Sequence, residues 1–465
     1  MMDKPATVKK REFPDTLVIL FGFMLLVAIL SYILPAGAYD MIKMATGKKM
    51  VDASSFHFIP QTPVTLAQFF TSPFRGIKVS MNTMTLIIMM GGAFNVIIDT
   101  KSIDLGFHNA AQKLQHKALL LIPIVMIICY ILGALQIVVN SIVAFIPVGV
   151  VLAKQLHLDA LAVMMILVVP VNIGFGSTPM GAFSVLIAQN IAELPPLSGF
   201  SYRATFGIIC LIVDILITMM YCKKIYDNPE KSSVGVYHQS AEMAKELQSV
   251  PFTWKHMLIL IVTLFSFALY AWGSFYHDWG MDMQGATVLG AALFAGILMK
   301  MSPNEIVRSF MNGAKGNLYG GLLTGIASAV LVLLQDGHII HTLVYYASIP
   351  LSHMSSHISA LGMLIFNYII NLVVPSGSGQ AYLVMPLMTP MADVLHISRQ
   401  VAVLAFQYGD GFGNLIIPTS SALMGSLGML GLAYPVWMKF FTKRFAIFFL
   451  ISCISVMGGV LTGLQ

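Results

Sequence analysis

Apolar segments of membrane-spanning length recur from one end of this chain to the other. About 20 apolar helical residues cross the hydrocarbon core of a bilayer, and runs of that order fill most of the 465 residues. Only 10% of the residues are charged, whereas a typical soluble domain has about 25%. Because backbone in hydrocarbon must satisfy its own hydrogen bonds, the sequence predicts an all-α polytopic membrane protein.

The apolar runs divide into nine predicted spans and two longer regions. Residues 118–152 and 358–395 are each too long for one span and are interrupted near the middle, so we interpret both as re-entrant helical hairpins. The spans are predicted at 15–35, 82–99, 160–192, 202–221, 256–275, 284–300, 317–335, 400–425 and 436–460.

The basic residues orient these spans. Lys and Arg gather in the N-terminal tail, in 101–117 and in the polar linker 222–255, whereas 194–201, 276–283 and 336–357 contain neither. Cytoplasmic loops are enriched in Lys and Arg, so we expect a cytoplasmic N-terminus and linker and, after nine crossings, a periplasmic C-terminus. The net charge of +6 is therefore a signal of topology, and no nucleic-acid partner is expected.

Two halves of the chain resemble each other. QTPVTLAQFFTSPFRG (61–76) aligns with MSPNEIVRSFMNGAKG (301–316) at an offset of 240 residues, and Ser141 aligns with Ser378 at an offset of 237. One extra span separates the copies, which therefore have opposite orientations; such inverted repeats are typical of secondary transporters, with the site at the midplane. The predicted parts are an N-terminal repeat (1–221), the cytoplasmic linker (222–255), a connecting span (256–275) and a C-terminal inverted repeat (276–465).

Four polar stretches rich in Gly, Ser, Asn and Pro interrupt the apolar regions. They form two pairs, because in each half a hairpin tip is followed by a broken span. Such irregular backbone is tolerated at membrane depth only beside protein or a water-filled cavity, although Gly and Pro also serve there as kinks and packing points. Four matched breaks favour a binding site in which helix ends face the ligand. The stretches are GALQIVVNSIVAF (133–145), NIGFGSTPMG (172–181), PSGSGQ (375–380) and QYGDGFGNLIIPTSS (407–421).

Asp410 lies between two Gly in the last of these stretches. A carboxylate at this depth is costly and is by default a functional hypothesis. We expect it to bind a proton, a cation or an amino group of the substrate, with a structural cap of the unwound loop as the alternative. Asp214, in CLIVDILI, has no such glycine context, and both interpretations stay open for it.

The sequence shows no catalytic or transition-metal motif. His338 with His341, and His353 with His357, have helical spacing but no third ligand nearby in the sequence. The four Cys show no CxxC spacing, and no hydrolase or nucleotide-binding motif has a supporting context. We therefore expect neither an enzyme nor a cofactor.

Residues 375–421, 174–203 and 34–40 carry a family resemblance. The first of these, PSGSGQAYLVMPLMTPMADVLHISRQVAVLAFQYGDGFGNLIIPTSS, resembles the signature region of the YfcC family of bacterial inner-membrane carriers. That family is similar to the C4-dicarboxylate carriers of the DcuC type, within the ion transporter superfamily. The resemblance implies a homodimer in the inner-membrane lipid bilayer, an elevator motion of a transport part against a scaffold, and Na⁺ or H⁺ as the coupling ion.

The breaks and the resemblance together define a candidate site for substrate and ion. Among its residues, those expected at a Na⁺ site are Asn140, Ser141, Gly176, Ser378 and Asn414. The full set is Asn140, Ser141, Gly176, Ser177, Thr178, Ser376, Gly377, Ser378, Gly379, Asp410, Asn414, Thr419 and Ser420.

The first hairpin tip departs from the family pattern. Members often carry two Glu there, whereas this chain reads IVVNSIVAF (137–145) with no acid. The partner of a cationic side chain is missing, which favours a small carboxylate-bearing solute: an amino acid, a dipeptide or a C4-dicarboxylate. Arg203 and Arg399 lie near span ends and are interpreted as anchors. We predict a secondary carrier that works by cation coupling or exchange; the alternatives are an arginine or ornithine antiporter and, in another class, an ion channel.

Overall fold

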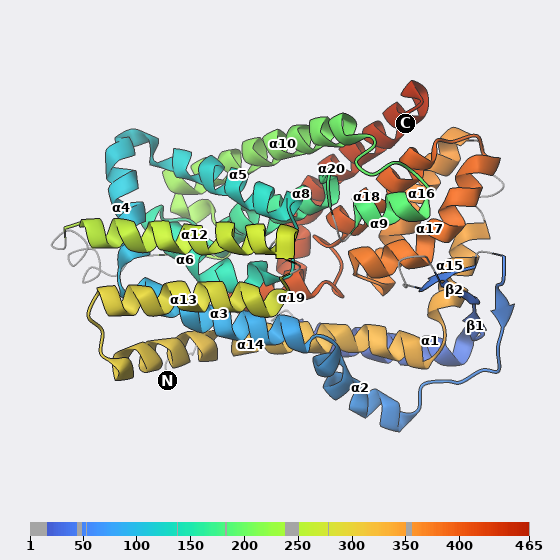
Figure 1. Ribbon diagram of the computed structural model, residues 1–465, viewed down its shortest axis with the longest axis horizontal. Coiled ribbons are helices and arrows are strands. Elements are labelled where there is room, and N and C mark those ends of the chain that lie inside the picture. The colour runs from blue at the N-terminus through green and yellow to red at the C-terminus, as the bar shows by residue number, and fades with distance from the viewer. Residues whose placement is uncertain are drawn as a thin grey trace, which may run out of the picture.

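The computed structural model describes residues 16–43, 49–52, 54–136, 138–181, 184–237, 251–277, 279–349 and 356–464. In these ranges the chain is mostly helical, and four short strands pair two by two, β1 with β4 and β2 with β3 (Figure 1).

The first half of the chain runs from α1 to α10. Its elements are α1 (Thr16–Ile33), β1 (Gly37–Ala38), β2 (Met41–Lys43), β3 (Lys49–Val51), β4 (His57–Phe58), α2 (Leu66–Val79), α3 (Met81–Asp99), α4 (Ser102–Leu114), the 3₁₀ turn η1 (Gln115–Leu120), α5 (Leu121–Ala134), the 3₁₀ segment η2 (Ser141–Phe145), α6 (Ile146–Gln155), α7 (Ala160–Val163), a π-helical turn η3 (Met164–Val168), α8 (Val169–Ser177), α9 (Val185–Ile191) and α10 (Phe200–Asp227).

The second half follows a short 3₁₀ turn, η4 (Pro229–Lys231), and begins at α12. Its helices are α12 (Trp254–His277), α13 (Met281–Leu298), α14 (Pro303–Asp336), α15 (Ile340–Ser348), α16 (Ser356–Val373), α17 (Gly377–Val394), α18 (Arg399–Gly413), α19 (Ser421–Met429) and α20 (Tyr434–Thr462).

All four polar stretches fall where helices end. The first lies between α5 and η2, and the third between α16 and α17. The region 160–192 stops being helical between Ser177 and Val185, and 400–425 stops between Gly413 and Ser421. Among the described residues, six stretches are long and apolar enough to cross a membrane, namely α3, 160–177, α10, α13, α14 and α20.

Three shorter helices, α2, α4 and α15, lie outside the predicted spans and hairpins. Helix α2 begins with a capping box in which the Thr65 side chain and Gln68 exchange hydrogen bonds. Ser302 and Glu305 form the same box at the start of α14. The predicted span 317–335 is consequently the second part of a 34-residue helix.

The helices form two groups (Figure 1). In the α14 group, α3 and α2 pack on α14, and α13 packs on both α3 and α12. In the α18 group, α16, α17, α8 and α20 pack on α18, and α5 and α10 pack on α8. The two groups meet where α19 packs on α14 and where η2 packs on α3.

Helices α8 and α18 cross with their backbones in contact at two glycines. A Cβ atom placed on Gly411 would lie 2.1 Å from the Cα of Gly176. No side chain fits at that separation, so the crossing requires Gly at this point. The crossing joins the two broken helices next to their breaks.

We predict that Gly411→Ala destabilises the protein by about 1–3 kcal/mol, because overpacking a tight contact costs about that much. The matched control is Gly290→Ala in α13, where a Cβ atom would meet nothing within 4 Å. The measurement is the midpoint of thermal unfolding in detergent. Equal midpoints for the two variants would contradict the close crossing.

Candidate functional site

A cavity of ≈ 410 Å³ lies between the two groups of helices, and both hairpin tips open into it. The tips are more than 200 residues apart in the sequence, and the opposite wall comes from α12, α13 and the turn between them. The lining residues are Leu86, Gln136, Val139, Asn140, Ser141, Phe175, Tyr270, Trp279, Gly280, Met281, Gln284, Pro375, Ser376, Gly377, Ser378 and Asn414. Six of the thirteen predicted site residues are in this list: Asn140, Ser141, Ser376, Gly377, Ser378 and Asn414.

The first tip is joined to the α14 group by a hydrogen bond. Gln284 of α13 donates from Nε2 to Oγ of Ser141 at 3.1 Å, and both side chains are buried. Ser141 begins η2, which packs on α3. This bond therefore connects the predicted ligand Ser141 to the facing wall.

The second tip presents the N-terminus of α17 to the cavity. The Ser376 side chain caps this helix by accepting from the N–H of Gly379 at 3.3 Å. The first N–H groups of a helix have no acceptor within the helix, and Gly377 and Ser378 line the cavity. The partial positive charge of the helix end therefore faces the same space as the Ser378 hydroxyl.

Asn414 reaches the cavity from the broken helix α18. Asn371 of α16 donates from Nδ2 to the Oδ1 of Asn414 at 3.2 Å and to the backbone carbonyl of Asp410 at 2.8 Å. These bonds fix the orientation of the Asn414 amide. Its Nδ2 is then the donor atom, and the Asp410 carboxylate is its neighbour within the protein.

Two predicted site residues fasten the broken helices to the hairpins. Thr178 donates its hydroxyl to the carbonyl of Ala134, at the end of the first arm of hairpin one, at 2.7 Å. Thr419 does the same to Leu372, near the end of the first arm of hairpin two, at 2.8 Å. Neither side chain lines the cavity.

The other predicted residues also make contacts within the protein. Ser177 donates to Ile173 one turn back at 2.6 Å, and Ser420 caps α19. Gly379 donates to the cap at Ser376, and Gly176 forms the crossing with α18. None of these four residues lines the cavity. The structure thus places residues of the two tips and Asn414 around one cavity, whereas the other predicted residues lie outside its lining.

Asp410 is buried one turn behind Asn414. Its side chain is 1% exposed, and neither carboxylate oxygen has a donor in hydrogen-bonding geometry among the described residues. Its polar neighbour is the side-chain amide of Asn414. A buried carboxylate without donors is costly when charged, so this position favours a bound proton or cation.

The interpretation of Arg203 as an interfacial anchor is wrong, because its side chain is fully buried. Its guanidinium donates to Oε1 of Gln407 at 2.9 Å, to Oε1 of Gln400 at 2.6 Å and to the carbonyl of Ser198 at 2.8 Å. Gln407 in turn donates to the carbonyl of Thr178, in the break after α8, at 2.6 Å. Arg203 therefore holds α10, α18 and this break together. Gln400 and Gln407 are two polar residues seven positions apart in an apolar helix. This pattern was the sequence signal that could have predicted the buried network.

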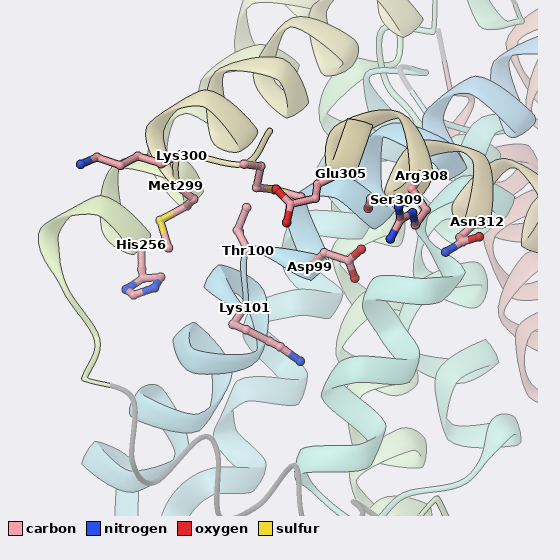
Figure 2. A pocket seen from close by; sticks show the side chains of 11 residues that line it. Asp99, Thr100, Lys101, His256, Met299, Lys300, Glu305, Arg308, Ser309 and Asn312 are labelled. Carbon is pink, nitrogen blue, oxygen red and sulfur yellow. The ribbon is translucent and has the colours of Figure 1, made fainter. Parts of the chain in front are cut away.

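A second, larger cavity of ≈ 540 Å³ contains none of the predicted site residues. It lies at the C-terminal ends of α3 and α13 and the first turns of α14 (Figure 2). Charges of both signs line it, and Glu305 interacts with the neighbouring Arg308. The charged residues of the described lining are Asp99, Lys101, Lys300, Glu305 and Arg308.

Comparison with known proteins gives one family and two full-length relatives. Residues 13–461 match the family of C4-dicarboxylate anaerobic carriers, DcuC. A protein of Escherichia coli K12 named "Putative basic amino acid antiporter YfcC" is 30% identical, with 98% of each chain covered. An uncharacterised protein of Haemophilus influenzae is 25% identical over 100% of this chain and 99% of the relative.

Among solved structures, that of Neisseria gonorrhoeae MtrF, described with a class of antimetabolite efflux pumps, aligns with 97% of this chain and 96% of its own. The TM-score is 0.45 and the identity 13%.

We predict that Arg203→Lys destabilises the protein by about 2–3 kcal/mol, because an ammonium cannot reproduce the forked bonds to Gln407, Gln400 and Ser198. Arg399→Lys is the matched control. Arg399 is partly exposed and pairs with Asp393 and Glu193, and exposed ion pairs contribute about 1 kcal/mol or less. Thermal unfolding of the two variants side by side measures the difference; similar losses would mean that the Arg203 network does not hold the break.

Proposed function

The chain belongs to the C4-dicarboxylate anaerobic carrier family, and on that premise we propose that it is a secondary active transporter of a small carboxylate-bearing solute. It works in the bacterial inner membrane, with Na⁺ or H⁺ coupling or by exchange. The observation that carries this proposal is the cavity that both hairpin tips enter. Helix ends, hydroxyls and amides converge there in the manner of midplane transporter sites.

The spacing of the elements supports two inverted repeats. The second hairpin arms begin at residues 141 and 377, the half-helices after the breaks at 185 and 421, and the last helices at 200 and 434. These separations are 236, 236 and 234 residues. The capping residues Thr65 and Ser302 are 237 residues apart. Alignment of the two capping boxes therefore gives an offset of 237 for this segment, whereas the sequence alignment of 61–76 gave 240. In Figure 1 the first hairpin lies in the left half and the second in the right half, which fits opposite orientations.

The division into two groups of helices supports an elevator motion. The α18 group carries both broken helices and the second hairpin, whereas the α14 group supplies the facing wall. Movement of the α18 group along α14 and α3 would carry the tips across the membrane. The bond between Gln284 and Ser141 would break in each cycle. The homodimer and the orientation of the termini, N-terminus cytoplasmic and C-terminus periplasmic, stay predictions.

A carboxylate is the substrate group that the second tip fits best. The N-terminus of α17 and the Ser378 hydroxyl offer hydrogen-bond donors and partial positive charge. A basic amino-acid antiporter is the second candidate, because the E. coli relative carries that name and because Asp410 is a buried carboxylate without a hydrogen-bond donor among the described residues.

The test is uptake into proteoliposomes that contain the purified protein. The panel comprises neutral, acidic and basic amino acids, a dipeptide and C4-dicarboxylates, under imposed Na⁺ or H⁺ gradients or with a counter-solute inside. We expect saturable accumulation of at least one carboxylate. Absence of uptake and exchange for every solute, together with an ohmic current, would identify a channel instead.

We predict that Ser378→Trp abolishes uptake, because an indole at the second tip fills the space that the solute needs. The control is Ser233→Trp, at an exposed position in the linker, which should transport at the wild-type rate. Both variants are compared at equal protein per liposome. Full activity of Ser378→Trp would remove the second tip from the site.

We predict that Asp410→Asn loses gradient-driven accumulation but retains exchange of solute against solute. The amide has nearly the same shape as the carboxylate but cannot take up a proton or neutralise a cation, so coupling fails while binding continues. The measurement compares uphill uptake with counterflow in the same liposomes. Unchanged dependence of uptake on pH and Na⁺ would show that Asp410 is structural.

A further inference from the structure

We propose that the solute is a neutral amino acid, a zwitterion with one carboxylate and an uncharged apolar or aromatic side chain. The inference rests on the proposed function and deepens it, because it excludes both a dicarboxylate and a basic amino acid. Two observations carry it: the described lining of the cavity has no charged side chain, and its wall on the α14 group is aromatic.

The described lining residues include no Asp, Glu, Lys, Arg or His. The nearby ionisable side chains are elsewhere: Asp410 lies behind Asn414, and Arg203 is enclosed by its own acceptors. Asp278, which precedes Trp279, lies outside the described residues. The α-ammonium of an amino acid is neutralised by its own carboxylate, but a further charge in the side chain would lose its water without gaining an ionic partner, which is costly. The larger cavity of Figure 2, by contrast, is lined by charges of both signs.

Among the described lining, one long helix offers its N-terminus to a carboxylate. Helix α17 has 18 residues, its N-terminal residues Gly377 and Ser378 line the cavity, and Asn414 lines the same cavity. The first tip leads only into η2, a 3₁₀ segment of five residues with little dipole. The first tip has the Ser141 hydroxyl, which accepts from Gln284 and can still donate, and the Asn140 amide. A second carboxylate would meet these single donors there but no N-terminus of a long helix.

The opposite wall fits an apolar or aromatic group. Tyr270 of α12 and Trp279 of the following turn line the cavity there, together with Met281. The Trp279 ring lies over Gly273, where a Cβ atom would come within 2.1 Å of it. It also stands edge-on to Trp272 at 6.3 Å between ring centroids. The ring is thus held in place, and an apolar side chain or an α-ammonium can pack against such an aromatic surface.

The first experiment measures binding without transport. The thermal midpoint of the purified protein is recorded with alanine, leucine, phenylalanine, succinate, fumarate, arginine and lysine in turn. We expect leucine and phenylalanine to raise the midpoint at concentrations at least about tenfold lower than succinate or arginine need. Equal or stronger stabilisation by succinate, fumarate, arginine or lysine overturns the inference, as does no stabilisation by any neutral amino acid. Binding of leucine or phenylalanine without uptake would instead refute the proposed transport and leave the inference standing.

The second experiment removes the aromatic wall. Trp279→Ala should weaken binding of phenylalanine and leucine by about 10–100-fold, as expected for losing the burial of one large apolar side chain, and that of alanine much less. Trp279→Phe should restore most of the affinity, and Trp254→Ala, at an exposed position at the start of α12, should leave it unchanged. An equal loss for alanine and phenylalanine in Trp279→Ala, or no loss, overturns the placement of the side chain against Trp279.

Discussion

The whole structure depends on the satisfaction of backbone hydrogen bonds where helices stop at membrane depth. An unpaired carbonyl in hydrocarbon costs several kcal/mol, so each break requires a side chain as donor. Thr178 and Thr419 donate to the ends of the two hairpin arms. Gln407 donates to the carbonyl of Thr178, and the indole N–H of Trp437 donates to that of Leu415. The packing of the α18 group is arranged around these donors.

The polar groups that face the cavity define the proposed site. The first N–H groups of α17, the Ser378 hydroxyl and the amide of Asn414 face the cavity. Arg203 contributes indirectly, because it holds the Gln407 amide that closes the first break. One side of each break is thus closed by a donor from the protein. At the two hairpin tips and at Asn414, the polar groups face the cavity, whereas Ser177 and Thr178 bond within the protein.

The sequence predicted where the helices break but not which side of a break faces the cavity. Gly, Pro and Ser within apolar runs mark lost helical geometry, and Asn140, Ser376 and Asn414 do line the cavity. Ser177 and Thr178 are small polar residues in a similar Gly-containing stretch, yet their hydroxyls donate to helix carbonyls instead of facing the cavity. Their direction depends on how α8 packs against α5 and α18, which only the tertiary structure determines.

The residues that sequence reasoning missed come from the other group of helices. Tyr270, Trp279 and Gln284 stand in segments with no break and no unusual charge, and they reach the cavity only because α12 and α13 pack beside α3. The repeat supplied no signal either, because α12 is the connecting span (256–275) and has no counterpart in the first copy. The aromatic wall is therefore a property of one half only.

This asymmetry has a consequence for the proposed elevator motion. A solute with its carboxylate at α17 and its apolar part against Trp279 would contact both groups of helices. When the α18 group moves, the carboxylate contacts travel with the solute, and the aromatic contacts stay behind. A ligand favours the state that it binds more tightly, so Trp279 would stabilise the end state in which the tips face the turn between α12 and α13. The barrier to leaving that state would then grow with the size of the apolar group, and larger side chains would bind more tightly but turn over more slowly.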